Sequence, residues 1–142
     1  MKSAQRGMTL VELLTVMVVV AILASIAVPS YRSYLIRSNR ADAKSALMQV
    51  QAAQEKFYLQ NNAYTDKVSD SPPTGLGLAA TTTNSFYSLS VALGAGGQTY
   101  TATATPTTAG GQSADTKCAN FTVTDIGKRG VSGTDTVANC WK

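Results

Sequence analysis

The chain has 142 residues, of which 12 are Lys or Arg, 8 are Asp or Glu and none is His. This length is typical of one domain, and the lack of His excludes His-based acid–base catalysis and His ligation of a metal. Gly94–Gly97 lacks the Lys-Ser/Thr ending of a phosphate-binding loop. We therefore expect no enzyme, no cofactor and no metal site. The acidic residues beyond position 60 are scattered without ligand spacing: Asp66, Asp70, Asp115, Asp125 and Asp135.

The N-terminus carries a short basic leader followed by a hydrophobic segment. Lys2 and Arg6 precede Gly7, and no charged residue occurs in 13–28. An ordinary secretory signal has its cleavage site after the apolar segment. Here the obvious processing position, Gly7, comes before it, so cleavage would leave the apolar segment on the mature protein.

The motif Gly7-Met8-Thr9-Leu10-Val11-Glu12 resembles the class III leader of type IV prepilins. This resemblance implies cleavage by prepilin peptidase between Gly7 and Met8 and N-methylation of Met8, where the family usually has Phe. It assigns Glu12, with Thr9 and Leu10, to subunit assembly. The implied partners are other pilin subunits and the inner-membrane assembly machinery. The implied segments are a leader (1–7), a hydrophobic transmembrane and assembly helix (8–30), an amphipathic helix (31–60) and a globular head (61–142).

Glu12 is a lone carboxylate near one end of a potential membrane span. Residues 8–28 would form a helix of roughly 30 Å, enough to cross the hydrocarbon core. An unpaired carboxylate deep in that core costs up to about 2.5–3.5 kcal/mol. Cleavage would create a partner, the α-amine of Met8, in the same chain or, as the resemblance implies, in a neighbouring subunit. The alternative is that Glu12 only extends to the lipid headgroups.

Pro29 follows the apolar segment and leaves the Ser25 carbonyl without its helical donor. The residues alone leave a kink and a helix end equally open. Pilins that this chain resembles continue past such a proline with a bend. The resemblance also implies that helicity is lost over 25–29 in the assembled filament.

Residues 31–60 have the pattern of an amphipathic helix that stops at Asn61-Asn62. The residues between the apolar positions, among them Arg37, Arg40 and Lys44, are predicted to face solvent. The predicted apolar stripe consists of Leu35, Ile36, Ala43, Leu47, Val50, Ala53 and Phe57.

The sequence after Asn62 predicts a loop over 64–83 followed by short strands. Alternation over 87–93 and 100–106 predicts two strands joined by a turn at Gly94–Gly97. A loop at Gly110-Gly111 precedes a third strand within 118–124, and a short fourth is expected at Val131 or Val137 after breaks at Gly127 and Gly130. The fold class is therefore α+β, a long N-terminal α-helix packed on a small antiparallel sheet of 3–4 strands, the type IV pilin fold.

Cys118 and Cys140 are the two cysteines of the chain. In the C-terminal region of an exported protein such a pair predicts a disulfide, which should stabilise the head by roughly 3 kcal/mol. Together with Gly127, Arg129-Gly130 and Trp141, they resemble the C-terminal region of PilE-like minor pilins.

The function expected is a structural subunit of a type IV pilus, serving adhesion, twitching motility or DNA uptake. It would be a single-pass inner-membrane precursor with a periplasmic C-terminal head, and later part of a surface pilus. One alternative is a pseudopilin of type II secretion, although the main pseudopilin usually lacks a C-terminal cystine. Another is a pilus-borne DNA receptor, in which Lys117, Lys128 and Arg129 contact phosphates.

Overall fold

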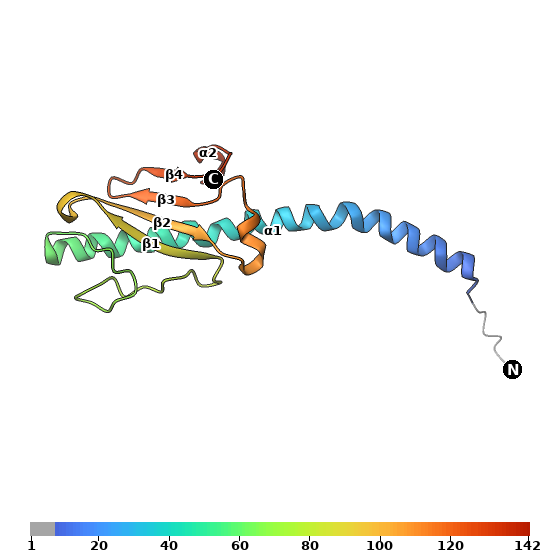
Figure 1. The fold of residues 1–142 in the computed structure, drawn as a ribbon, viewed down its shortest axis with the longest axis horizontal. Helices are drawn as coiled ribbons and strands as arrows, with labels where there is room; N and C mark the ends of the chain where they lie inside the picture. The colour runs from blue at the N-terminus through green and yellow to red at the C-terminus, as the bar shows by residue number, and fades with distance from the viewer. Residues whose placement is uncertain (1–7) are drawn as a thin grey trace. The chain divides into compact units, whose positions relative to one another are not determined.

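The structure is a computed structural model that describes residues 8–142. The predicted processing position Gly7 lies outside the described residues. The chain divides into two compact units at the Leu35–Ile36 bond, and α1 contributes to both. In chain order the elements are α1 (Leu10–Asn61), β1 (Tyr87–Leu93), η1 (Ala95–Gly97), β2 (Tyr100–Pro106), η2 (Ala109–Ala114), β3 (Phe121–Thr124), β4 (Arg129–Val131) and α2 (Val137–Cys140) (Figure 1).

The first unit consists of the N-terminal part of α1, in which every residue from 8 to 35 is exposed. By length and composition α1 has one segment apolar enough to cross a membrane. The helix runs through Pro29, so the alternative of a helix end there is excluded. The kink at Pro29 stays a prediction.

The second unit is a four-stranded antiparallel sheet in the order β1-β2-β3-β4, with residues 36–61 of α1 along one face (Figure 1). Alternation along the strands directs Tyr87, Tyr100 and Phe121 into the core, where none is more than 2% exposed. Ala43, Leu47 and Val50 of α1 meet them there. This arrangement confirms the predicted meander packed on the helix.

The short fourth strand predicted at Val131 or Val137 is present as β4, which includes Val131, but two details differ from the prediction. Gly130 does not break the chain: it lies within β4 and pairs with Thr122. A Cβ at Gly130 would lie 2.5 Å from Thr122 Oγ1, so glycine permits this close approach. Val137 begins the short helix α2 and not a strand, because the Thr136 side chain caps it by accepting the Asn139 N–H.

Gly110 and Gly111, where a loop is predicted, lie within the segment η2, but their backbone conformation is not helical and they form a kink between two short turns. Both have positive φ, 59° and 70°, which glycine adopts without steric cost. The turns of η2 bring the residues that follow, Gln112 and Asp115, into the protein interior.

The predicted solvent exposure of Arg40 is wrong, and a second polar residue of α1, Gln54, for which no prediction was made, is also buried. Arg40 is 8% exposed and Gln54 is fully buried. The Gln54 side chain donates to the Thr65 carbonyl and accepts the Thr65 N–H. Both backbone hydrogen-bonding groups of Thr65, in the loop after α1, therefore have a partner. The predicted stop of the helix is confirmed: α1 ends at Asn61, and Asn62 follows with a φ of 52°.

The predicted disulfide between Cys118 and Cys140 is present, and both cysteines are buried. It joins the chain entering β3 to the end of α2. The disulfide therefore links the two ends of the C-terminal segment, 118–140, to each other next to the core.

Candidate functional site

The first turn of α1 is organised by Thr9. Its hydroxyl accepts the Glu12 N–H at 3.3 Å, and its carbonyl accepts the Leu13 N–H at 3.2 Å, so Thr9 is the N-cap. Thr9 and Glu12 have the spacing of a capping box, a local signal from which the start of the helix is predictable. The Glu12 carboxylate thus lies in the first turn, where the helix dipole favours a negative charge.

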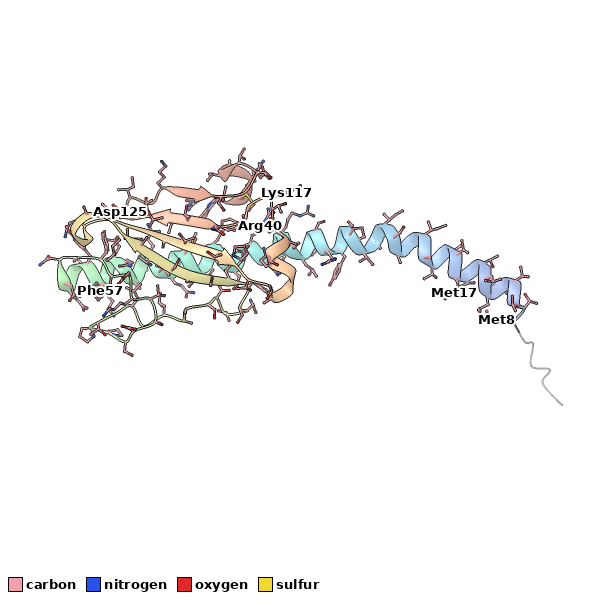
Figure 2. All side chains as sticks on the ribbon, viewed as in Figure 1. Met8, Met17, Arg40, Phe57, Lys117 and Asp125 are labelled. Carbon is pink, nitrogen blue, oxygen red and sulfur yellow. A yellow bond between two sulfur atoms is a disulfide. The ribbon has the colours of Figure 1, made fainter. Side chains whose placement is uncertain are left out.

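Apolar side chains surround this carboxylate without covering it. Met8 is 65% and Leu10 is 75% exposed. Figure 2 shows the side chains from Met8 past Met17 standing away from the helix. An exposed apolar surface this continuous marks contact with a membrane or with other protein.

A buried ion pair joins α1 to the C-terminal region of the head. Arg40 donates twice to Asp115, Nε to Oδ2 and Nη2 to Oδ1, both at 2.8 Å. Asp115 Oδ1 also accepts the Cys118 N–H at 3.2 Å. The sequence predicts that Arg40 faces solvent and shows Asp115 as one of several scattered acids, so this pair is not predictable from the sequence. No local pattern connects two residues 75 positions apart.

A tyrosine next to the ion pair belongs to the same buried group. The hydroxyl of Tyr87 accepts a hydrogen bond from Gln112 Nε2 at 2.7 Å. Burial, with the Asp115 charge second, raises the pKa of Tyr87 well above its ordinary value. The group is held together by charge and hydrogen bonds inside the core and has no exposed reacting atom, so it indicates a structural role.

The three candidate DNA-contacting residues, Lys117, Lys128 and Arg129, are all exposed, but they do not come together. Arg129 begins β4, opposite Val123, and Lys128 is in the turn before it. Lys117 lies before the other end of β3, so the β3–β4 hairpin separates it from the other two.

Arg129 instead joins cations from other elements. Its guanidinium lies 5.0 Å from the centre of the Trp141 ring, and Lys44 Nζ of α1 donates to the Lys142 carbonyl. Burial, then the charges of Arg40 and Arg129, lowers the pKa of Lys44. We call Lys44, Arg129, Trp141 and Lys142 the basic C-terminal surface. An open groove of about 600 Å³ lies beside it, and Met48 contributes to the groove's apolar lining.

Within residues 8–142 no group of three or more Cys, Asp or Glu side chains is arranged to hold a metal ion. Two ion pairs occur in this part of the chain, Arg40–Asp115 and Lys67–Asp70. The site candidates are therefore the exposed N-terminal helix with its capped carboxylate and the basic C-terminal surface.

Two family profiles match the chain. Residues 29–122, more than half of it, match the family described as "Type IV minor pilin ComP, DNA uptake sequence receptor". Residues 2–28 match the prokaryotic N-terminal methylation motif.

Individual relatives agree with the profiles. The chain is 38% identical over 61 residues to the type IV major pilin protein PilA of Myxococcus xanthus, covering 43% of this chain and 28% of PilA. It is 32% identical over 105 residues to the fimbrial protein EcpC of Eikenella corrodens, covering 74% of this chain and 65% of EcpC. The chain thus spans less than two thirds of these relatives. A solved type IV pilin from Shewanella oneidensis is similar with a TM-score of 0.47 and 24% identity, covering 66% of this chain and 89% of that one.

Proposed function

The chain belongs to the type IV minor pilin family, and from this premise we propose that it is a structural subunit of a type IV pilus, polymerised through its N-terminal helix. The observation that carries the proposal is the exposed apolar helix with one carboxylate in its first turn. The segments are those expected from the sequence: leader 1–7, assembly helix 8–30, amphipathic helix 31–60 and head 61–142.

Processing supplies the counter-charge in this mechanism. Prepilin peptidase cuts between Gly7 and Met8 and methylates the new amine, which becomes an ammonium group near the entry of the helix. In the filament, the Glu12 carboxylate pairs with the amine of a neighbouring subunit. Pairing removes two unpaired charges from an apolar environment and sets the axial position of one subunit on the next.

The membrane holds the subunit until assembly. The lipid solvates the apolar side chains of 8–28, and in the filament the same surface is buried against other helices. At about 25 cal/mol per Å² of apolar surface, this exchange avoids a large hydrophobic cost of exposure to water. The assembly machinery of the inner membrane then has to supply only the difference between the two apolar environments.

The head faces the periplasm in this proposal. The buried Cys118–Cys140 disulfide supports that orientation, because disulfides form and persist in oxidising compartments. The precursor is then a single-pass inner-membrane protein whose head is already oxidised when it enters the pilus.

The assembly mechanism is tested with Glu12→Gln, which removes the charge and keeps the size. We expect this subunit to be absent from sheared surface filaments, while the head keeps its disulfide and its protease resistance in the membrane fraction. Glu55→Gln is the matched control, since Glu55 is exposed on the same helix. Normal incorporation of the Glu12→Gln subunit would show that charge pairing does not drive assembly. Mass spectrometry of the wild-type subunit should find a methylated Met8 at its N-terminus.

A pseudopilin of type II secretion would share the leader and the helix. The profile match over 29–122 supports a pilin, because it covers most of the head as well as part of the helix. A deletion strain separates the two: loss of surface fibres supports a pilin, whereas loss of secreted enzymes with intact fibres supports a pseudopilin.

A second candidate function is DNA binding by the assembled or membrane-bound subunit. Two observations favour it: the matching family is described as a DNA uptake sequence receptor, and Lys44, Arg129 and Lys142 share a surface with an aromatic ring. Cations bind phosphates and release counterions, so binding of this kind weakens as salt rises.

This candidate is tested by fluorescence anisotropy of the full chain in detergent with a DNA duplex. Arg129→Gln should weaken binding and reduce the slope of log K against log salt by about 1. Lys67→Gln is the control, because Lys67 is an exposed cation of the loop after α1 and is remote in sequence from the surface. Absence of binding at low salt would exclude the DNA function and leave the structural function intact.

A further inference from the structure

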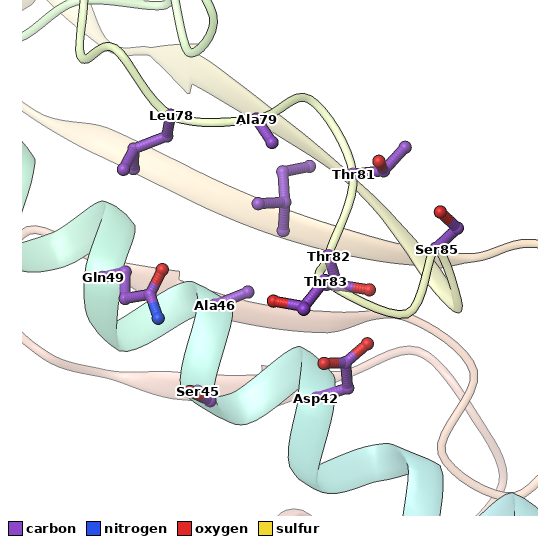
Figure 3. Close-up of a pocket in the computed structure, with 11 residues that line it drawn as sticks. Asp42, Ser45, Ala46, Gln49, Leu78, Ala79, Thr81, Thr82, Thr83 and Ser85 are labelled. Atoms are coloured by element: carbon purple, nitrogen blue, oxygen red, sulfur yellow. The ribbon is translucent and has the colours of Figure 1, made fainter.

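The head contains a second site that the pilus function does not use. A cavity of about 280 Å³ lies between α1 and the loop that leads into β1 (Figure 3). Asp42, Ser45 and Gln49 line it from α1, and threonine and serine side chains line it from the loop 81–85. All of these residues belong to the same compact unit.

Asp42 brings an incompletely satisfied carboxylate to this cavity. Its Oδ1 accepts a long hydrogen bond from Asn84 Nδ2, at 3.4 Å. Its Oδ2 is buried and has no hydrogen-bond partner among the residues that the structure describes. A buried carboxylate oxygen needs a donor, preferably a charged one, to compensate for its lost hydration.

The opposite wall is held in place by the sheet. The Thr82 hydroxyl accepts the Tyr87 N–H at 3.2 Å, and the Thr82 N–H donates to the Tyr87 carbonyl at 2.9 Å. The Ser85 carbonyl accepts the Thr107 hydroxyl at 2.6 Å. Because these bonds tie the loop to β1 and to the residue after β2, the cavity is formed before any ligand enters, which reduces the cost of binding.

The residues that line the cavity determine the charge and the shape of the ligand that it can bind. Asp42 is the one charged residue among the side chains that line the cavity. Ala46, Leu78 and Leu89 supply an apolar patch next to the carboxylate and the hydroxyls. A single carboxylate is too few for a calcium or magnesium site, which takes several oxygen ligands. A neutral sugar would leave the carboxylate charge uncompensated, and the lining has no aromatic ring to stack against it.

We propose that this cavity binds a primary alkylammonium group, with the ammonium donating to the Asp42 carboxylate and the alkyl stem against Leu78 and Leu89. The group is either a small free amine or a lysine side chain of another protein. The remaining ammonium protons are donated to the neighbouring hydroxyl oxygens of the loop. This site does not depend on the pilus function. Ser45 and Gln49 line both this cavity and the groove beside the basic C-terminal surface, but the carboxylate of Asp42 lines the cavity alone.

The charge requirement is tested by NMR titration of the full chain in detergent with n-butylammonium and with 1-butanol. The two probes share the stem and differ in charge. We expect saturable binding of n-butylammonium in about the millimolar range, with shifts at the amides of the loop 78–85, and at least about tenfold weaker binding of 1-butanol. Equal binding of both, or no saturable binding of n-butylammonium, would overturn the proposal on the wild-type chain alone.

The role of Asp42 is tested in the same titration. Asp42→Asn should weaken n-butylammonium binding by at least about tenfold, whereas Asp66→Asn, an exposed acid in the loop after α1, should leave it unchanged. Unchanged binding in Asp42→Asn would overturn the assignment. Since Asp42→Asn removes a charge that lacks full compensation, the variant should still fold.

Two further probes distinguish between a free amine and a lysine side chain as the natural ligand. Preferential binding of 1,5-diaminopentane supports a free amine, and preferential binding of N-acetyl-lysine amide supports a lysine side chain. A carbodiimide cross-link from Asp42 to a lysine of another subunit in sheared filaments would identify the source as a protein. Failure of both probes to bind would refute the site and would leave pilus assembly unaffected.

Discussion

A buried charge pair is the residue-scale feature on which the head depends most. Arg40 and Asp115 have side chains that are 10% and 1% exposed and are joined by two hydrogen bonds of 2.8 Å. Burial of both charges costs solvation free energy, which the mutual attraction offsets only while both partners are present. Asp115 also accepts the Cys118 backbone N–H, so its removal leaves that N–H and two N–H groups of Arg40 without this acceptor.

Asp115→Ala should therefore lower the free energy of unfolding by about 3–5 kcal/mol. The measurement is urea denaturation of the full chain in detergent, followed by the fluorescence of Trp141, the single tryptophan, which lies against Phe121. Asp70→Ala is the control: Lys67 and Asp70 are 3.9 Å apart and half exposed, so its loss should cost at most about 1 kcal/mol. Equal effects of the two variants would contradict a stabilising buried pair.

Tyr100 is a residue whose buried hydroxyl has no hydrogen-bond partner in the described part of the chain. Burial, then the charges of Glu55, Tyr64 and Asp125, raises the pKa of Tyr100 to about 12. The unfolded chain releases this proton near pH 10, whereas the folded head keeps it up to about pH 12. The stability contributed by the neutral form is complete below pH 10 and is lost as the pH rises through 12.

Tyr100→Phe should accordingly reduce the fall in stability between about pH 10 and pH 12. At neutral pH the variant should be as stable as the wild type or more stable, because the orphaned hydroxyl is removed. The check is urea denaturation at several pH values, with Tyr34→Phe, at an exposed tyrosine, as control. A steeper alkaline loss in Tyr100→Phe would contradict the raised pKa.

At the scale of elements, the C-terminal region is closed by the disulfide. The bond spans 22 residues and encloses β3, β4 and most of α2. These elements are short, and β4 forms the edge of the sheet. Trp141 fastens the end of the segment, since its indole N–H donates to the Gly130 carbonyl at 3.1 Å.

The double variant Cys118→Ala/Cys140→Ala should lower the free energy of unfolding by roughly 3 kcal/mol, as the entropy of a loop of this length requires. Ala keeps the sites apolar, which matters because both cysteines are buried. Urea denaturation of the oxidised wild type, the reduced wild type and the variant measures the effect. The reduced wild type should have the same free energy of unfolding as the variant. If the variant were as stable as the oxidised wild type, the disulfide would contribute nothing to stability.

At the scale of the whole molecule, the two units differ in what they bury. No residue from 8 to 35 is buried, whereas the unit from Ile36 onward has a continuous core. The folding of the head is therefore predicted to be independent of the apolar helix. The helix, in turn, requires an apolar environment that a single chain does not provide.

A chain that lacks residues 1–28 should be soluble without detergent and monomeric. Its free energy of unfolding should match that of the full chain in detergent within about 0.5 kcal/mol, since no buried contact is lost. Sedimentation and urea denaturation test both statements. Aggregation of the shortened chain, or a large loss of stability, would indicate that the apolar segment contributes to the folded head.

The boundaries of α1 and of the first three strands followed from local signals. Asn61-Asn62 ended the helix as predicted, and the alternation over 87–93 and 100–106 placed β1 and β2 correctly. Local signals failed at Gly130, where glycine serves a close strand contact instead of a break, and at Val137, where the cap at Thr136 begins a helix. At Gly130 the deciding residue, Thr122, lies on the neighbouring strand, whereas at Val137 it is the adjacent Thr136, an N-cap signal that the prediction did not use.

The sequence by itself determined the family, the apolar helix with its carboxylate, the meander and the cystine, because each depends on periodicity or on a motif of adjacent residues. Only the tertiary structure decided that Arg40 and Gln54 are inside, that Arg129 faces Trp141 and Lys44, and that Asp42 lines a cavity. The physical reason is that burial of a polar group is favourable only when a partner is present. Those partners, such as Asp115 for Arg40, lie far away in the chain.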